Sequence, residues 1–372
     1  MVQPPQLRIV ALLSMLIVLQ PACASDTTEA APPAIGGRVP LTVPEPKAAR
    51  EKHLVAVVAD NAGTEITDFV VPYGVLAASG AANVVPVSAE PGPVNLFPAL
   101  KLHLDRTLAD FDAQHPQGAD IVVVPAMHQV DDDIIIRWLQ RQWQSGALLV
   151  GVCDGVLTLA QAGLLEGRRA TGHWYSMSKL RREHPDTTWV PDRRYVADGP
   201  VVTTTGVTAS IPVSLALVEA IGGRSVATRT AAELGVTDYQ PDHDSDAFGL
   251  SGRLVSTALG NLTRFWGHET VGLEVHDGID EIALALTADA WSRTYRSQAV
   301  ALHPDQATVR SKRGLAIGID GSRVAADHSP NVVSRHPARA LDRALAEMAE
   351  RYGRPTAEFV AMQLEYELTP AR

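Results

Sequence analysis

The sequence has little cysteine and little clustered positive charge. Only two of its 372 residues are cysteines, Cys23 and Cys153, and 32 basic residues stand against 42 acidic ones, which leaves a formal net charge of −10. Binding to a phosphate backbone needs clustered basic residues, so we do not expect nucleic acid as a partner. The 12 histidines are also scattered, and we expect neither a metal nor another cofactor. With 46% hydrophobic and 20% charged residues, the chain predicts a globular protein with a full core.

The N-terminus lacks an apolar run long enough to cross a bilayer, but it has the order of a secretory signal. Residues 9–19 form an apolar run after Arg8, and small residues follow. Two outcomes stay open, namely cleavage after Ala24 at an A-x-A pattern and lipid attachment at Cys23. Residues 1–24 therefore predict an exported protein, which is periplasmic or secreted in the first case and a membrane-anchored lipoprotein in the second.

The remaining chain divides into a linker and an α/β domain. Residues 25–50 are rich in proline and glycine and predict an extended linker. In residues 51–223, short β-branched runs alternate with amphipathic stretches, which predicts an α/β fold with a doubly wound, mostly parallel sheet. The predicted strands are 54–59, 83–87, 121–124, 148–152 and 201–204, and the predicted helices are 69–78, 131–144, 155–162 and 211–221.

Residues 224–372 predict a second, smaller α/β region. Residues 271–282 can be laid over residues 55–66. This similarity leaves two alternatives, a degenerate partial repeat of the first domain or a chance likeness of two strand–loop–helix units. No second cysteine follows the later predicted strand, and residues 338–364 predict a pair of amphipathic helices.

Removal of a signal after Ala24 would leave Cys153 as the single thiol, so no disulfide could form within the chain. An isolated cysteine is most often a small buried hydrophobe, but Gly151 and Gly155 flank this one in the G-x-C-x-G spacing of a nucleophile elbow. The helix after the elbow would direct its free N–H groups at the sulfur, and we expect its dipole to lower the thiol pKa. Asp154 opposes this effect and is a candidate for shaping substrate choice.

Three motifs carry a family resemblance. They are Gly151-Val-Cys-Asp-Gly155, Ala162-Gly-Leu-Leu-Glu-Gly-Arg-Arg-Ala-Thr-Gly-His-Trp174 and Thr204-Thr-Gly-Val-Thr-Ala209. In this order and spacing, the chain over about residues 53–223 resembles the ThiJ/PfpI family of the class I glutamine amidotransferase-like superfamily. The C-terminal region resembles that of some long bacterial members. The resemblance implies a flavodoxin-like fold and a site centred on the cysteine.

The resemblance also implies roles for single residues. Active members use an acid from the loop after the first strand, and Asp68 occupies that position, with Glu65 as its competitor. His173 corresponds to a family histidine near the cysteine, but no acid stands two residues later, so glutamine hydrolysis is disfavoured and a structural role for His173 stays open. We predict Cys153, Asp68 and His173 as catalytic residues, and Asp154, Gly155, Trp174, Thr205 and Gly206 as the substrate or oxyanion pocket.

The expected function is that of an exported, cysteine-dependent enzyme acting on a small electrophile without a cofactor. An α-oxoaldehyde or an isocyanide would be hydrated or hydrolysed, or converted by glyoxalase-type chemistry. The alternative is a non-catalytic module of the same fold that binds a small ligand or senses oxidation at Cys153. Relatives fused to DNA-binding domains are regulators, but the signal segment and the lack of a basic helix-turn-helix argue against that role. Peptidase or chaperone activity and homo-oligomerisation stay open.

Overall fold

The computed structural model describes residues 41–264, 267–321 and 325–368. The predicted signal and most of the predicted linker therefore lie outside the described residues. None of the helices in these ranges is both long enough and apolar enough to cross a bilayer.

The described end of the predicted linker is packed against the domain instead of forming an extended tether. Lys47 Nζ donates hydrogen bonds to the carbonyl oxygens of Gln117 at 2.7 Å and of Ala119 at 2.6 Å. Leu41 is buried in the core. The tether prediction is thus wrong for residues 41–50, because composition does not reveal that a lysine will find free carbonyl groups beside the sheet.

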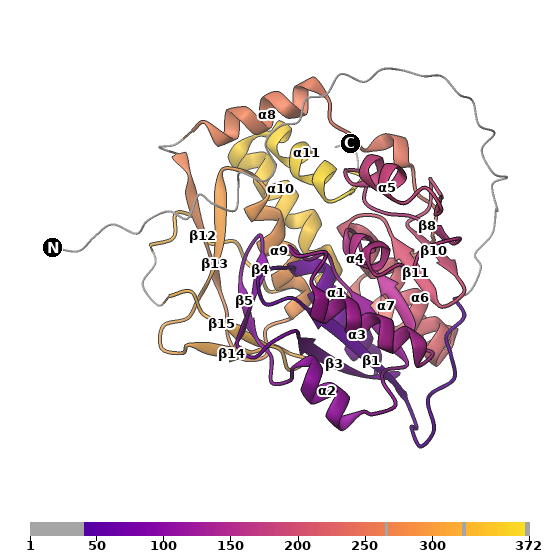
Figure 1. Cartoon of the computed structure of the whole chain (residues 1–372). Coiled ribbons are helices and arrows are strands. Elements are labelled where there is room, and N and C mark those ends of the chain that lie inside the picture. The colour runs from indigo at the N-terminus through magenta and orange to yellow at the C-terminus, as the bar shows by residue number, and fades with distance from the viewer. Residues whose placement is uncertain (1–40, 265–266, 322–324, 369–372) are drawn as a thin grey trace, which may run out of the picture. The chain divides into compact units, whose positions relative to one another are not determined.

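A six-stranded sheet with the order β10-β11-β7-β6-β1-β3 forms the centre of the N-terminal half (Figure 1). Its neighbours pair in parallel, except for the antiparallel pair of β10 and β11. The five predicted strands are confirmed, and β10 is the strand that the sequence did not predict. The strands are β1 (His53–Ala59), β3 (Ala82–Ser88), β6 (Ile121–Val124), β7 (Leu148–Gly151), β10 (Tyr195–Asp198) and β11 (Val201–Thr204).

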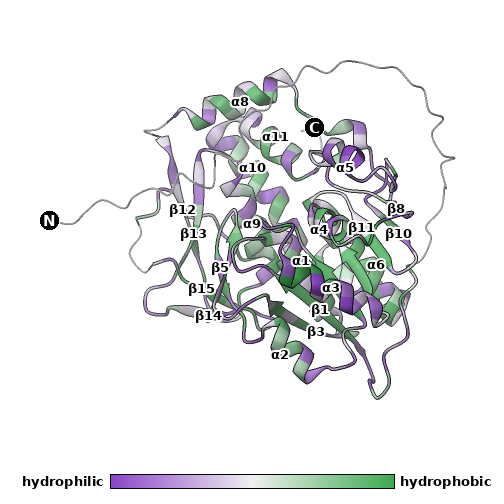
Figure 2. Ribbon diagram, in the orientation of Figure 1, coloured by the Kyte–Doolittle hydropathy of each residue, from purple (hydrophilic) through white to green (hydrophobic). Residues whose placement is uncertain are grey.

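Helices cover both faces of this sheet, which explains why the strands are apolar on both sides (Figure 2). One core cluster joins Val55 and Val57 of β1 to α1, α6 and α7, and the other joins Ala56 and Val58 to α2, α3 and α4. The predicted α/β, flavodoxin-like fold class and the four predicted helices are confirmed. The helices are α1 (Ile66–Ser79), α2 (Leu108–Gln114), α3 (Asp133–Gln144), α4 (Gly155–Gln161), α6 (Ser210–Gly222) and α7 (Arg224–Leu234).

The C-terminal half repeats the order of elements found at the start of the chain. The series β12, α9, β13, β14 and β15 follows the order of β1, α1, β3, β4 and β5, and β12 pairs with β13 in parallel as β1 does with β3. The bounds are β4 (Pro93–Phe97), β5 (Lys101–His103), β12 (Glu269–Glu274), α9 (Glu281–Ser292), β13 (Ser297–Leu302), β14 (Thr308–Arg310) and β15 (Ala316–Gly318).

The final helix pair also resembles an earlier one. Helices α10 (Ala340–Tyr352) and α11 (Arg354–Gln363) are joined at Gly353 with φ 90° and ψ 150°, as α6 and α7 are joined at Gly223 with φ 82° and ψ 166°. Both glycines adopt a left-handed φ that favours glycine. These matches support the proposal of a degenerate partial repeat, in which no counterpart of β6 to β11 occurs among the residues that the structure describes.

The two halves are joined by a sheet edge and a helix pair. Strands β5 and β15 pair antiparallel within the sheet β14-β15-β5-β4-β2, where β2 is Thr64–Glu65. Helices α1 and α9 pack together in antiparallel fashion (Figure 1). A Cβ at Gly74 would lie 2.6 Å from Ile282 Cγ1, so the absence of a side chain there permits the close approach. The remaining elements are β8 (Arg169–Ala170), α5 (Met177–Glu183), β9 (Thr188–Trp189) and α8 (Gly252–Leu262).

Candidate active site

Cys153 lies on a sharp turn between β7 and α4. Its φ of 54° is in the left-handed region, which is strained for a residue other than glycine. Two contacts hold the turn. The Cys153 N–H donates to Thr204 Oγ1 at 3.0 Å, and Gly155 packs so closely on the Val124 carbonyl that no side chain fits there. The structure thus has the elbow that the glycine spacing predicts, and Gly155 contributes close backbone packing.

The Cys153 thiol is buried, with 6% of its surface exposed. Burial raises its pKa well above the usual value, and the carboxyl groups of Asp68, Asp154, Glu65 and Glu365 raise it further. The predicted lowering of the thiol pKa is therefore wrong, because α4 has only seven residues and its dipole is outweighed by desolvation and four nearby acids. The predicted opposing effect of Asp154 has the expected sign.

Asp68 is fully buried in the first turn of α1. Its Oδ2 accepts a hydrogen bond from the Ala126 N–H at 3.3 Å, whereas its Oδ1 has no hydrogen-bond partner among the described residues. Burial, followed by the charge of Glu65, raises the Asp68 pKa well above its usual value. This shift favours the protonated form of Asp68, and its Oδ1 is free for a proton transfer near Cys153.

Glu65, the competing candidate, is fully engaged in structural contacts. Its Oε2 accepts from the Asp68 N–H at 2.7 Å and from the Thr67 hydroxyl at 2.8 Å, so it caps the N-terminus of α1. Its Oε1 accepts from Arg293 Nη2 at 2.7 Å. The geometry therefore favours Asp68 as the reactive acid.

His173 and Asp154 both lie beside the sulfur. Cys153 Sγ, one carboxylate oxygen of Asp154 and one ring nitrogen of His173 all lie within 4.8 Å of one another. These three residues could hold a metal ion. His173 Nε2 is 3.1 Å from the Gln363 carbonyl oxygen and 3.9 Å from Glu365 Oε1. A proton on Nε2 would be donated to that carbonyl and would leave Nδ1 as the basic nitrogen.

Glu365 is a site residue that the sequence analysis missed. Its buried carboxylate accepts hydrogen bonds from the N–H groups of Trp174 and Gly206, both at 2.8 Å, and lies 3.3 Å from His243 Nε2. Burial alone would raise its pKa, but His243, the charge of His173 and these N–H groups lower it to about 2. Trp174 and Gly206 were predicted to belong to a substrate or oxyanion pocket, but their N–H groups are occupied by Glu365 and do not face an open oxyanion pocket.

The contacts of Thr205 and His243 did not follow from the sequence. The Thr205 N–H donates to the Arg194 carbonyl at 2.9 Å, so Thr205 supports the loop, and its neighbour Thr204 is the residue that bonds the elbow. Residues 242–246 form an acidic loop, yet the side chain of its His243 is only 4% exposed and stacks on Phe248. No motif marks Glu365 or His243, and an isolated histidine within an acidic loop was the only signal.

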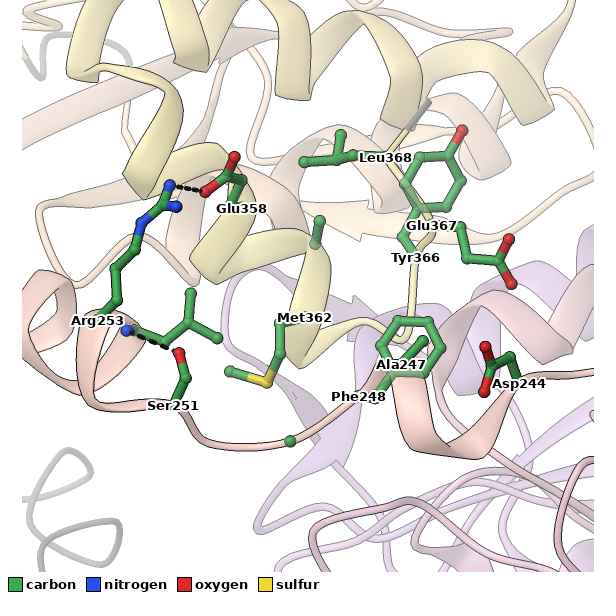
Figure 3. A pocket seen from close by; sticks show the side chains of 13 residues that line it. Asp244, Ala247, Phe248, Ser251, Arg253, Glu358, Met362, Tyr366, Glu367 and Leu368 are labelled. Carbon is green, nitrogen blue, oxygen red and sulfur yellow. Dashed lines mark hydrogen bonds and ion pairs between the residues drawn. The ribbon is translucent and has the colours of Figure 1, made fainter. Parts of the chain in front are cut away.

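A cavity of about 520 Å³ is lined by Phe248 and twelve other residues (Figure 3). Cys153 is not among its lining residues. Figure 3 shows an ion pair between Arg253 and Glu358 at one end and the carboxylates of Asp244 and Glu367 at the other. Its wall adjoins the cysteine site, because Phe248 stacks on His243 and the lining residue Tyr366 directly follows Glu365.

Comparison with known proteins identifies the N-terminal domain. A model of the DJ-1/PfpI family matches residues 53–220. The isonitrile hydratase of Pseudomonas putida is 30% identical over 179 residues, which represent 47% of this chain and 73% of the hydratase. This chain belongs to the DJ-1/PfpI family. The resemblance to the ThiJ/PfpI family that the three motifs predicted is therefore confirmed.

Two further proteins are also similar to this chain. The HTH-type transcriptional regulator CdhR of Pseudomonas aeruginosa is 27% identical over 201 residues, and the match spans 52% of this chain but only 58% of the regulator. The crystal structure of Drosophila melanogaster DJ-1beta matches 50% of this chain and 100% of its own, with 21% identity and a TM-score of 0.46.

The DJ-1/PfpI segment does not contain every group of the site. Cys153, Asp68 and His173 lie within residues 53–220. His243 and Glu365, by contrast, come from the part of the chain that follows the family match. The site of this DJ-1/PfpI protein is thus completed by residues from its own C-terminal region.

Proposed function

We propose that this DJ-1/PfpI protein is an exported hydratase or hydrolase in which Cys153 adds to a small electrophilic carbon. The observation that carries the proposal is the convergence of a buried thiol, the buried acid Asp68, whose pKa is raised, and His173 at a strained elbow. The similarity to an isonitrile hydratase supports an isocyanide as the substrate class. The small exposed area of the sulfur also favours a narrow substrate, and the terminal carbon of an isocyanide is narrow.

A thiol that gives up its proton as it attacks, beside an acid that can supply one, suits this chemistry. The Cys153 sulfur bonds to the isocyanide carbon while the same carbon gains a proton, which gives a thioimidate with an S–CH=N linkage. Water then adds to that carbon, the C–S bond breaks, sulfur regains a proton and an N-substituted formamide leaves. In this scheme Asp68 delivers its proton to carbon and takes up the thiol proton in exchange, and His173 accepts a proton from the attacking water and passes it to the nitrogen. The proton that returns to sulfur comes from the new hydroxyl group as the C–S bond breaks.

The test is steady-state turnover on a panel of isocyanides and α-oxoaldehydes. We expect formamide production from an isocyanide, and a loss of about 10³-fold or more in Cys153→Ala, since no other described group can form the thioimidate. Ser214→Ala serves as the control, because it removes one buried hydroxyl from α6 outside the site. Turnover that persists in Cys153→Ala would contradict the proposal.

Export is tested on the mature N-terminus. Residues 1–24 support two products, a chain that begins at Ser25 or a chain that begins with a lipid-modified Cys23. Intact mass of the protein recovered from its producing cells distinguishes them. Recovery of the full-length chain with its N-terminal segment intact would overturn the export proposal.

A ligand-binding module is the second candidate, and the cavity in Figure 3 favours it. Phe248, Met362 and Tyr366 offer an apolar and aromatic wall, and the carboxylates of Asp244 and Glu367 suit a small organic cation. Equilibrium dialysis with phenethylammonium and with phenylacetate tests it. Binding of the cation alone that survives Cys153→Ala supports a binding module, and equal binding of both probes, or of neither, contradicts it.

The redox-sensing form of this alternative has its own test. A sensor thiol would be oxidised to the sulfinic state by mild peroxide before general damage occurs. The raised pKa of the buried Cys153 thiol argues against this, because the thiolate is the species that reacts. Intact mass after graded peroxide treatment decides, and early oxidation at Cys153 would favour the sensor.

A further inference from the structure

Four charged or acidic side chains meet between α1 and α9. Glu65, Asp68 and Asp289 are 2%, 0% and 1% exposed. Arg293 is the cation among them, since its Nη2 donates to Glu65 Oε1 at 2.7 Å and its Nε donates to Asp289 Oδ1 at 2.6 Å. Buried carboxyl groups are costly unless they are paired or protonated. Arg293 therefore holds together a cluster that belongs to both halves of the chain.

One branch of this cluster leads to the acid of the site. The Glu65 carboxylate that accepts from Arg293 also accepts the Asp68 N–H and the Thr67 hydroxyl. These bonds fix the first turn of α1, and Asp68 stands in that turn. The guanidinium of Arg293 thus sets where the Asp68 carboxyl lies.

A second branch leads to the histidine. The backbone carbonyl of Arg293 accepts a hydrogen bond from Gln363 Nε2 at 3.0 Å. The carbonyl of Gln363 in turn lies 3.1 Å from His173 Nε2. Arg293 is therefore linked to Asp68 through its side chain and to His173 through its main-chain carbonyl.

We propose that Arg293, which comes from the C-terminal half, is a positioning residue for the chemistry of Cys153. It anchors Asp68 through Glu65 and supports the carbonyl that faces His173. The inference rests on the proposed function of Cys153. It gives the C-terminal half a role in the site although no second cysteine lies there.

Charge adds to the positioning. Burial would lower the pKa of Arg293, but Asp289, Glu65 and Cys153 raise it, so the guanidinium stays charged. A fixed positive charge favours the anionic form of a nearby sulfur. Loss of Arg293 is therefore expected to make the Cys153 thiol harder to ionise as well as to release the first turn of α1.

The test compares Arg293→Gln and Arg293→Lys with a matched control at the other end of the same helix pair. Arg313 Nη1 donates to Glu281 Oε1 at 2.6 Å and to Asp280 Oδ2 at 3.1 Å, and the Arg313 carbonyl accepts from Tyr73. Arg313→Gln therefore also removes a guanidinium from two buried or half-buried carboxylates, but without a link to Asp68 or His173.

Two readouts are taken on the full chain across pH 6 to 10, namely kcat on the isocyanide substrate and the alkylation rate of Cys153 by iodoacetamide. We expect Arg293→Gln to lower kcat by about tenfold or more and to move the alkylation profile to higher pH. Arg293→Lys should recover part of the alkylation profile because it keeps the charge. Equal profiles for Arg293→Gln and Arg313→Gln would overturn the inference.

Glu65→Gln alone, compared with Arg313→Gln, tests the path if Arg293→Gln does not fold, and a double-mutant cycle tests it if both variants fold. Glu65→Gln can keep the cap on α1 or the bond to Arg293, but it cannot keep both with one carbonyl oxygen. Its loss of kcat should match that of Arg293→Gln, and combining the two should add little. Additive losses would contradict a shared path through Glu65. If wild-type protein turns over no isocyanide, the alkylation profiles still test Arg293, so the two proposals fail separately.

Discussion

The two β-α-β units of this chain, β1-α1-β3 and β12-α9-β13, share a scaffold but differ in their chemical groups. Each has a parallel strand pair and a helix that packs against the helix of the other unit. In the alignment of residues 271–282 with residues 55–66, Glu281 falls on Glu65. Extended along the helix, the alignment places Leu284 where the first unit has Asp68. The comparison teaches that the scaffold does not require the acid, because a buried leucine fills its place.

The second unit carries its polar groups at the opposite end of its helix. Asp289 and Arg293 of α9 fall where α1 has Tyr73 and Ala77. Because the helices run antiparallel, the end of α9 lies beside the start of α1, where Glu65 accepts from Arg293. The second unit thus lacks a site of its own and supplies groups to the site of the first.

The largest expected effect is on kcat and concerns Asp68, the acid that the second unit lacks. Asp68→Asn should lower kcat by about 10²-fold or more, because an amide cannot exchange the proton that a carboxylic acid delivers. Leu284→Ala, at the matching position of α9, should leave Cys153 alkylation nearly unchanged while it lowers the free energy of unfolding by about 2–5 kcal/mol. Steady-state kinetics and urea unfolding measure the two. Equal kinetic losses in both variants would mean that Asp68 acts only through stability.

A second difference separates the ends of the two helix pairs. α11 is followed by Glu365 at a φ of 52°, where α7 is followed by Gly235 at 79°. The folded pKa of Glu365 is lowered to about 2 from a usual 4.5, so its stabilisation is complete above pH 4.5 and is lost as the pH falls toward 2. The loss is about 3 kcal/mol. Urea unfolding at pH 7 and pH 3 should show a smaller acid loss in Glu365→Gln, and an unchanged loss would refute the assignment.

The smallest effect concerns the contact between the two helices. Gly74→Ala should lower the free energy of unfolding by about 1–3 kcal/mol, because its methyl group would collide with Ile282. Ala290, which the extended alignment places opposite Gly74, can be changed to glycine at a cost of about 0.5–1 kcal/mol, mostly from the greater freedom of the unfolded chain. Thermal unfolding measures both. A larger loss for Ala290→Gly would indicate that the close approach lies on α9.

Much of the fold followed from local pattern, and so did the position of the nucleophile. The strands of the central sheet are apolar on both faces, so their sequence alone marked them, whereas the partly exposed hairpin of β4 and β5 carried no such signal. Gly151 and Gly155 predicted the elbow because the turn is a local steric matter. His243, Arg293 and Glu365 were missed, because they lie 90 or more residues from Cys153 in the sequence and no motif links them to it.

The sequence by itself therefore determined the α/β class and the elbow at Cys153, since both depend on short-range patterns, and the family resemblance proposed Asp68 and His173 as partners of the cysteine. Only the tertiary structure decided the pKa of the Cys153 thiol and the position of the Glu365 carboxylate beside it. The helix dipole is visible in the sequence next to Cys153, but desolvation and the charges of remote carboxyl groups are not. Trp174 and Gly206 were predicted to belong to a pocket, but the group that accepts from their N–H donors, Glu365, comes from near the end of the sequence.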